Sequence, residues 1–348
     1  MATPQIRVVF IEDSSLMRLI ISDLLRSDPA IDLVDTAQNG KEGLEKVKQH
    51  RPDVVITDLV MPDYDGLYVV QRIMQEVPTP VVVLSALEKA NPRVFDALQE
   101  GAVEFVDKPK NRVISHLREV DQPLLRAVKL AAAADISKLA CQKRRQNTFA
   151  HTFAAELPYE IVCLGASTGG PGAIESILTR LPENLVIPVV IAQHMPERFL
   201  ETFAQRLNNL IPLRVKLAEK GETPTGGTVY LAPGHSNTTL VREPLGGRAL
   251  FKFTDRAFRE FNHPSVDCLM LSVAKTYGAR AIGVLMTGMG RDGTEGMAAI
   301  YAGGGYTLVQ DEASSVVYGM GRSALETGVV RRSVSLADIP GFLIGCLS

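Results

Sequence analysis

A serine stands in a short glycine-rich segment that joins an apolar run to a helical pattern. The segment reads GASTG, from Gly165 to Gly169, with Ser167 at its centre. This spacing matches GxSxG, in which a tight turn between a strand and a helix holds up a serine nucleophile. The pattern is common by chance, so nucleophilic chemistry also requires a base and an acid supplied by neighbouring strands.

Two other uses of a glycine-rich turn fit this segment less well. A dinucleotide loop has the spacing GxGxxG and an acidic residue at the end of the next strand. Here the glycines are spaced differently, and the next apolar run ends in Gln193 and His194. A P-loop would need a lysine followed by serine or threonine, and none follows these glycines. A nucleotide-binding regulator is therefore the weaker hypothesis.

A general base for Ser167 is expected at the end of the following strand. His194 closes that strand and would lie beside Ser167 at the same edge of a parallel sheet. His235 and His263 are rivals, although both fall in predicted loops.

The third member of a triad orients the imidazole and stabilises it when it is charged. Two strand ends offer a carboxylate for this task, Asp292 in LMTGMGRDGTEG and Asp311 in TLVQDEAS. The residues alone place Asp292 only slightly ahead of Asp311.

A second set of reactive side chains lies near the N-terminus. Glu12 and Asp13 end the first predicted strand, and Asp58 ends the third. Ser85 and Lys108 end the fourth and fifth. Three carboxylates at one edge repel each other and need a hard cation such as Mg²⁺. One of them can then accept a phosphoryl group beside the lysine and the hydroxyl.

The elements that must position these residues alternate between strands and helices. Five short β-branched runs occur before residue 130, and a second alternation begins near Tyr159. The sequence therefore predicts two α/β units, a (βα)5 unit over 1–130 and a doubly wound, mostly parallel unit over 158–348. Hairpin signals in the second unit indicate a mixed sheet. Residues 131–157 are expected to form a linker.

Composition excludes several classes of protein. The chain has 348 residues, 46% hydrophobic residues and a net charge of −2, so nucleic acid is not an expected partner. We find no signal peptide and no long apolar run, so a cytoplasmic protein without membrane insertion is expected. The four cysteines are widely spaced, which favours reduced thiols.

The strand-end residues of the first unit resemble the signature of response-regulator receiver domains. That resemblance implies a flavodoxin-like fold, a phosphorylation site at Asp58, and Mg²⁺ held by Glu12, Asp13 and Asp58. It also implies a CheA-type histidine kinase as phosphodonor. Phosphorylation is expected to act through a switch formed by Ser85, Lys108 and the segment around Phe105.

The second unit resembles the catalytic domain of the CheB family of chemotaxis protein-glutamate methylesterases. The segments GASTGGP, QHMPERF, LAPG, HPSVDCL, LMTGMGRDGTEGM and VQDEASSVVYGM carry this resemblance. It implies Ser167 as nucleophile, His194 as base and Asp292 as orienting acid. It also implies hydrolysis of glutamate γ-methyl esters on chemoreceptors, with deamidation of receptor glutamines, and no cofactor for the esterase reaction.

Backbone N–H groups at Thr168 and Met289 are the expected oxyanion hole. A phosphorylation-controlled docking module with a vestigial hydrolase site is the alternative from another class. Occupation of all three triad positions disfavours that alternative.

Overall fold

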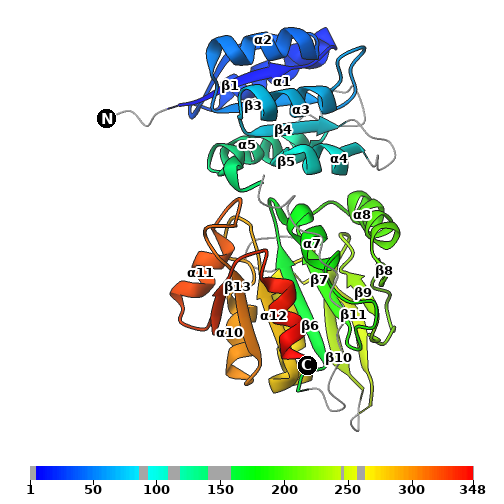
Figure 1. Ribbon diagram of the computed structural model, residues 1–348. Helices are drawn as coiled ribbons and strands as arrows, with labels where there is room; N and C mark the ends of the chain where they lie inside the picture. The colour runs from blue at the N-terminus through cyan, green and yellow to red at the C-terminus, as the bar shows by residue number, and fades with distance from the viewer. Residues whose placement is uncertain are drawn as a thin grey trace. The chain divides into compact units, whose positions relative to one another are not determined.

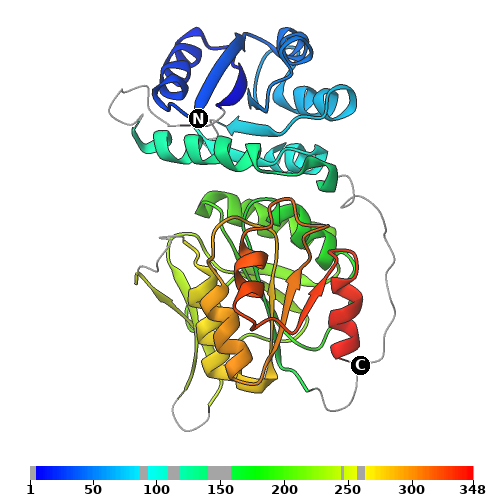
Figure 2. The same cartoon turned by 90° about the vertical axis from the view of Figure 1, so that its left-hand side faces the viewer.

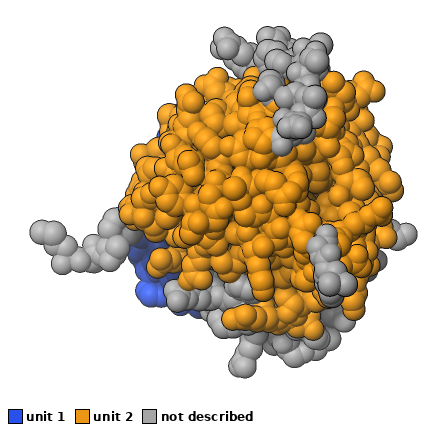
Figure 3. Space-filling view, turned by 90° about the horizontal axis from the view of Figure 1, so that it is seen from below, with its two compact units in different colours: residues 1–140 blue, residues 141–348 orange. Residues whose placement is uncertain are grey.

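The chain divides into two compact units, residues 1–140 and 141–348, which are coloured separately in Figure 3. This computed structural model describes residues 5–85, 93–108, 118–139, 158–243, 247–256 and 263–347. Most of the expected linker, 131–157, falls outside the described residues, so its bounds stay a prediction. Cys163, Cys268 and Cys346 carry free thiols, and Cys141 lies outside the described residues.

The first unit contains one five-stranded parallel sheet in the order β2-β1-β3-β4-β5. This is the flavodoxin-like order, and all five expected strands are present. The strands are β1 (Ile6–Ile11), β2 (Ile31–Ala37), β3 (Val54–Asp58), β4 (Val81–Ser85) and β5 (Glu104–Asp107). The helices are α1 (Ser15–Ser27), α2 (Gly40–His50), α3 (Gly66–Glu76), α4 (Arg93–Glu100) and α5 (Arg118–Ala132), followed by the short helix η2 (Ile136–Lys138).

The second unit is built on a seven-stranded sheet in the order β14-β13-β12-β6-β7-β9-β8. Its strands are β6 (Ile161–Ala166), β7 (Val189–Gln193), β8 (Arg214–Leu217), β9 (Thr228–Leu231), β12 (Ala281–Leu285), β13 (Tyr306–Gln310) and β14 (Arg332–Val334). A separate antiparallel ribbon pairs β10 (Asn237–Arg242) with β11 (Ala249–Thr254). The helices are α7 (Gly170–Leu178), α8 (Glu197–Leu210), α9 (Val266–Tyr277), η4 (Gly278–Arg280), α10 (Thr294–Ala302), α11 (Met320–Glu326) and α12 (Ile339–Cys346).

Helices pack around the seven-stranded sheet, whose strands β6, β7, β9 and β13 are labelled in Figure 1. In Figure 2, α9 and α10 lie on one face and α12 lies on the other. The central strands β6, β7 and β12 are buried along their whole length because both faces are covered. The doubly wound fold predicted for this unit is confirmed.

Two details of the predicted second unit are wrong. The seven-stranded sheet is parallel throughout, because the antiparallel pair β10–β11 forms its own ribbon instead of joining it. The strands β10 and β14 were not expected. The first is rich in polar residues and the second has only three residues, so neither gives a clear apolar alternation.

The order of strands reverses direction at β6. From β6 the chain moves outward to β7 and β9, and later returns to β12 on the opposite side of β6. Ligands of open α/β sheets bind beyond the carboxyl ends of the strands at such a point. The residues that follow β6, β7 and β12 are therefore the ones to inspect.

Candidate active site

Ser167 directly follows β6 in a tight turn that leads into α7. Its carbonyl oxygen accepts a hydrogen bond from the backbone N–H of Gly170 at 2.8 Å, which closes the turn. Gly169 has a φ of +76°, a conformation that L side chains rarely adopt. The strand–turn–helix context expected for GxSxG is confirmed, and the side chain of Ser167 is half-buried.

His194 lies next to Ser167 because β6 and β7 are neighbouring parallel strands. Their last residues, Ala166 and Gln193, are partners in register, and the N–H of His194 donates to the carbonyl of Ala166 at 3.0 Å. The residues one step further, Ser167 and His194, therefore stand side by side at the carboxyl edge of the sheet. Only 10% of the His194 side chain is exposed.

The imidazole of His194 turns one nitrogen toward a carboxylate. Its Nε2 lies 2.7 Å from Oδ2 of Asp292, which follows β12 on the other side of β6. The Nδ1 atom is buried and has no hydrogen-bond partner among the described residues. Nδ1 is thus the nitrogen left to receive the proton of Ser167. A serine and its base often lie farther apart than a hydrogen bond until the substrate binds, so the missing bond between Ser167 and Nδ1 is compatible with this role.

Asp292 is held by the first turn of α9. Its oxygens accept hydrogen bonds from Ser265 Oγ at 3.0 Å and from the backbone N–H groups of Val266 at 2.8 Å and Asp267 at 2.9 Å. Burial by itself raises the pKa of Asp292, but the bonds from His194 and this helix terminus outweigh it and lower the pKa. The carboxylate is therefore ionised at neutral pH and suited to stabilise an imidazolium.

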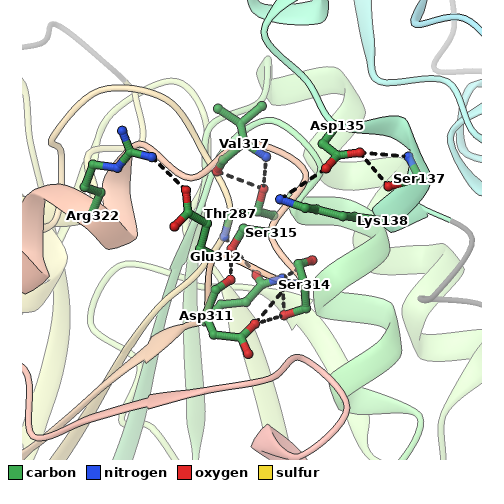
Figure 4. Close-up of polar contacts among 11 residues, drawn as sticks. Asp135, Ser137, Lys138, Thr287, Asp311, Glu312, Ser314, Ser315, Val317 and Arg322 are labelled. Carbon is green, nitrogen blue, oxygen red and sulfur yellow. Dashed lines mark hydrogen bonds and ion pairs between the residues drawn. The ribbon is translucent and has the colours of Figure 1, made fainter.

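Asp311, the other aspartate considered for this role, caps a turn. Asp311 Oδ1 accepts two hydrogen bonds from Ser314, one from its backbone N–H at 2.9 Å and one from the Ser314 Oγ at 2.6 Å (Figure 4). The structure brings His194 to Asp292, and Asp311 serves the loop after β13.

The two rival histidines lie in other surroundings. His235 Nδ1 is 2.7 Å from Glu197 Oε1 in a pair that is about half exposed. His263 is exposed and precedes α9. Neither forms the contact with Asp292 that His194 makes.

The two segments expected to form the oxyanion hole flank Ser167. Thr168 is buried and its carbonyl accepts a hydrogen bond from Thr287 Oγ1 at 3.0 Å. Gly288 passes so close that a Cβ added to it would lie 2.6 Å from Ser167 Cβ. Met289, the next residue, is exposed.

Several residues that support the site were not singled out from the sequence. Thr287 joins the turn at Thr168 to Val317, whose N–H donates to Thr287 Oγ1 at 3.0 Å (Figure 4). Ser265 supplies one of the bonds to Asp292, and Gln193 contacts the backbone of both Ser167 and His194. The signal available for Gln193 was a polar residue at the end of an apolar strand, directly before the histidine.

The receiver site gathers at the carboxyl edge of the first sheet. Carboxylate oxygens of Glu12, Asp13 and Asp58 all lie within 4.8 Å of one another. Lys108 Nζ contacts Asp58 Oδ2 at 2.9 Å and also forms an ion pair with Glu12. Ser85 is fully buried, and its Oγ has no hydrogen-bond partner among the described residues.

Burial disfavours the charged form of the carboxylates in this cluster. It raises the pKa of both Glu12 and Asp58 even though Lys108 opposes the shift. Close hard oxygen donors with excess negative charge suit Mg²⁺. Phe105, expected in the switch, is buried in β5, and Pro109 lies outside the described residues.

Within the described part of the chain, none of the helices combines the length and apolar character needed to cross a bilayer.

Comparison with known proteins identifies a family for each of the two units. Residues 162–343 match the family described as CheB methylesterase, and residues 8–118 match the response regulator receiver domain. A protein-glutamate methylesterase/protein-glutamine glutaminase of Geobacillus kaustophilus is 40% identical over 343 residues, covering 97% of this chain and 98% of that protein. A protein of the same name from Pyrococcus abyssi is 36% identical over 344 residues, covering 97% and 92%.

A solved structure supports the fold of the second unit. The crystal structure of the CheB methylesterase catalytic domain of Thermotoga maritima is similar with a TM-score of 0.52 and 36% identity, covering 54% of this chain and 98% of that one. The match spans the unit that carries Ser167, His194 and Asp292. The chain belongs to the CheB methylesterase family and carries a response-regulator receiver domain in front of the catalytic domain.

Proposed function

We propose that this protein is a phosphorylation-activated protein-glutamate methylesterase. It hydrolyses γ-methyl esters of glutamate on chemoreceptors and deamidates receptor glutamines, by a Ser-His-Asp mechanism. The observation that carries the proposal is the placement of His194, bonded to Asp292 through Nε2 and adjacent to Ser167 at the ends of paired strands. The names of the related proteins support the choice of substrate.

The chemistry follows from the two ring nitrogens of His194. Nδ1 takes the proton of Ser167 Oγ as that oxygen attacks the ester carbonyl, and Asp292 stabilises the resulting imidazolium through Nε2–H. Backbone N–H groups of Thr168 and Met289 donate to the oxyanion. The imidazolium then returns its proton to the departing oxygen, and methanol leaves.

Water completes the reaction. His194 takes a proton from a water molecule as that water attacks the glutamyl-serine ester. The imidazolium then returns the proton to Ser167 Oγ as this oxygen leaves, which releases the glutamate and restores the free serine. A glutamine side chain forms the same intermediate with loss of ammonia, so one site performs both reactions. The proposal assigns no metal or cofactor to these steps.

The receiver unit controls this activity through Asp58. We assign phosphorylation of Asp58 to a CheA-type histidine kinase, with Glu12, Asp13 and Asp58 holding Mg²⁺. When bound, that ion neutralises charge on the transferring phosphoryl group. Lys108 and Ser85 then contact the phosphoryl oxygens, and the segment around Phe105 responds. We place the activity in the cytoplasm, without membrane insertion and without nucleic acid as partner.

The substitution Ser167→Ala tests the proposal directly. The variant should release no methanol from methyl-labelled receptor membranes, because it lacks the nucleophile while it opens no large cavity. Ser176→Ala, in the adjoining helix α7, is the matched control and should retain full activity. Methanol release by a clean Ser167→Ala preparation would contradict the mechanism, and its absence in the wild-type protein would contradict the function.

A further inference from the structure

A buried glutamine connects the backbones of the nucleophile and the base. Gln193 is the last residue of β7 and only 2% of it is exposed. Its Nε2 donates a hydrogen bond to the carbonyl oxygen of Ser167 at 3.0 Å and another to the carbonyl oxygen of His194 at 3.0 Å. One amide group therefore holds the two chain segments that the reaction requires side by side.

The bond to Ser167 determines the direction of a neighbouring N–H group. The carbonyl of Ser167 and the N–H of Thr168 belong to one planar trans peptide, so they point in opposite directions. The carbonyl oxygen accepts from Gly170 N at 2.8 Å as well as from Gln193. Two donors converging on one oxygen fix the plane of the peptide, and with it the direction of the Thr168 N–H.

The site requires an amide and not merely a side chain of this length. Both neighbours of Nε2 are carbonyl oxygens, which only a donor can satisfy. The Oε1 atom of Gln193 is buried without a hydrogen-bond partner among the described residues. A buried acceptor without a partner is unfavourable, so the two bonds donated by Nε2 have to offset the cost of Oε1.

The amide of Gln193 packs closely against the start of α7. A Cβ added to Gly170 would lie 2.0 Å from Gln193 Oε1 and 2.8 Å from the Cβ of Ala166. The glycine at the start of α7 thus lets the amide approach the turn closely enough to reach Ser167. The amide, the turn and the end of β6 form one closely packed unit.

We propose that Gln193 is a positioning residue for the oxyanion hole, which acts by clamping the Ser167 and His194 carbonyls and so aiming the Thr168 N–H at the reacting oxygen. This inference rests on the proposed function, because it concerns the donor assigned there to the oxyanion. It predicts that Gln193 contributes in the transition state and little to substrate binding.

Gln193→Met tests the inference because methionine has similar length but cannot donate. We expect kcat to fall about 10²-fold, near the effect of losing one oxyanion donor, with KM changed less than twofold. Gln193→Glu, which sets a carboxyl oxygen against two carbonyls, should lose at least as much. A receptor peptide with a boronic acid in place of the γ-ester should bind both variants more weakly, by the same factor as kcat/KM falls.

Thr307→Val is the matched control for a loss of buried hydrogen bonds. Thr307 Oγ1 donates to Val329 O at 2.7 Å and accepts from Arg331 N at 3.1 Å, away from the carboxyl edge of the sheet. This variant should lose stability in urea while keeping kcat and the affinity for the boronic acid. Such a result separates positioning from general weakening of the fold.

The possible failures are distinguishable. If Gln193→Met keeps kcat within twofold while Ser167→Ala is inactive, the proposed function stands and the role of Gln193 is wrong. The role is also wrong if kcat falls but the boronic acid binds unchanged, or if only KM rises. If Ser167→Ala matches the wild-type protein in methanol release, the proposed function fails and the inference about Gln193 fails with it.

Discussion

At the scale of single residues, the site depends on how one carboxylate is kept charged. Asp292 is 3% exposed and still has a lowered pKa, because a helix terminus and an imidazole both donate to it. Asp267, the second residue of α9, has a pKa that is shifted in the opposite direction. Burial raises its pKa to about 7, and the nearby charge of Asp292 adds to the shift, although the N–H of Gly296 donates to its Oδ1.

The two aspartates considered for the triad should differ sharply when each is changed to asparagine. Asp292→Asn removes the charge that stabilises the imidazolium and sets an amide N–H against donors, so we expect kcat to fall about 10⁴-fold, as in serine proteases. Asp311→Asn keeps an oxygen for Ser314 and should change kcat less than twofold. Methanol release measures both, and a larger loss for Asp311→Asn would reject Asp292 as the orienting acid.

The raised pKa of Asp267 predicts a pH dependence of stability. The pKa of this carboxyl is about 7 in the folded state and 3.8 in the unfolded chain, so the folded protein binds the proton more tightly. Its favourable contribution is therefore complete below about pH 4 and is lost as the pH rises to 7, by at most about 1.4 kcal/mol per pH unit.

Asp267→Asn should remove this slope while its oxygen still accepts from Gly296. The free energy of unfolding of the catalytic unit, measured from pH 4 to 8 for both proteins, provides the comparison. We expect the variant to gain stability relative to the wild-type protein as the pH rises. Parallel curves would show that Asp267 titrates normally.

At the scale of elements, the close approach of β6 to α9 aligns the triad. Gly165 lies where a Cβ would be 2.2 Å from Val266 Cγ1, and Val266 is the first residue of the helix that holds Asp292. The absence of a side chain at Gly165 thus allows the N-terminus of α9 to approach β6 and reach the carboxylate of Asp292. The contact between Gly165 and Val266, two residues before Ser167 in the chain, therefore positions both α9 and the carboxylate of Asp292 that α9 holds.

Gly165→Ala should therefore impair activity through packing alone. The added methyl group would displace α9, so we expect a loss of about 1–3 kcal/mol of stability, typical of overpacking, together with reduced kcat. Gly341→Ala in α12, where a Cβ meets nothing within 4 Å, is the matched control. It should stabilise the protein by about 0.5–1 kcal/mol, since alanine favours a helix more than glycine does. Thermal unfolding with methanol release checks both, and equal stability of the two variants would contradict this account.

At the scale of the whole molecule, two chemically different sites occupy equivalent places. Each lies at the carboxyl edge of a parallel sheet, one around Asp58 and one around Ser167. The first sheet gathers carboxylates with a lysine, which suits a phosphoryl group and a divalent cation. The second gathers a hydroxyl, an imidazole and one carboxylate, which suits acyl transfer.

Phosphorylation should connect the two sites in the intact chain. A small-molecule phosphodonor with Mg²⁺ should raise methanol release by the wild-type protein and leave Asp58→Asn at its basal rate. Removing the metal with EDTA should abolish the rise but not the basal rate, because the mechanism proposed for the esterase assigns no step to a metal. Asp63→Asn, at an exposed position of the same loop, is the control and should still respond. If phosphodonor raised methanol release by Asp58→Asn, or if EDTA removed the basal activity, the assignment of separate roles to the two sites would be contradicted.

Much of this organisation was already determined by the sequence. Alternating apolar and helical patterns predict two parallel α/β units, and side chains that end parallel strands must meet at one edge. That geometric rule alone brought Glu12, Asp13 and Asp58 together, and it placed His194 beside Ser167. The family resemblance then named Asp292. The boundaries of the linker, 131–157, rest on the sequence alone.

Only the tertiary structure decided which strands are neighbours, and that choice sets the rest of the site. β6 pairs with β12 across more than 100 residues of chain, so local periodicity carries no sign that Asp292 will face His194 while Asp311 caps a turn. The clamp made by Gln193 was hidden for the same reason. In the sequence, Gln193 looks like any polar residue at the end of a strand. Its role depends on the turn after β6, which packs against its amide and supplies the carbonyl oxygen of Ser167 as a hydrogen-bond partner.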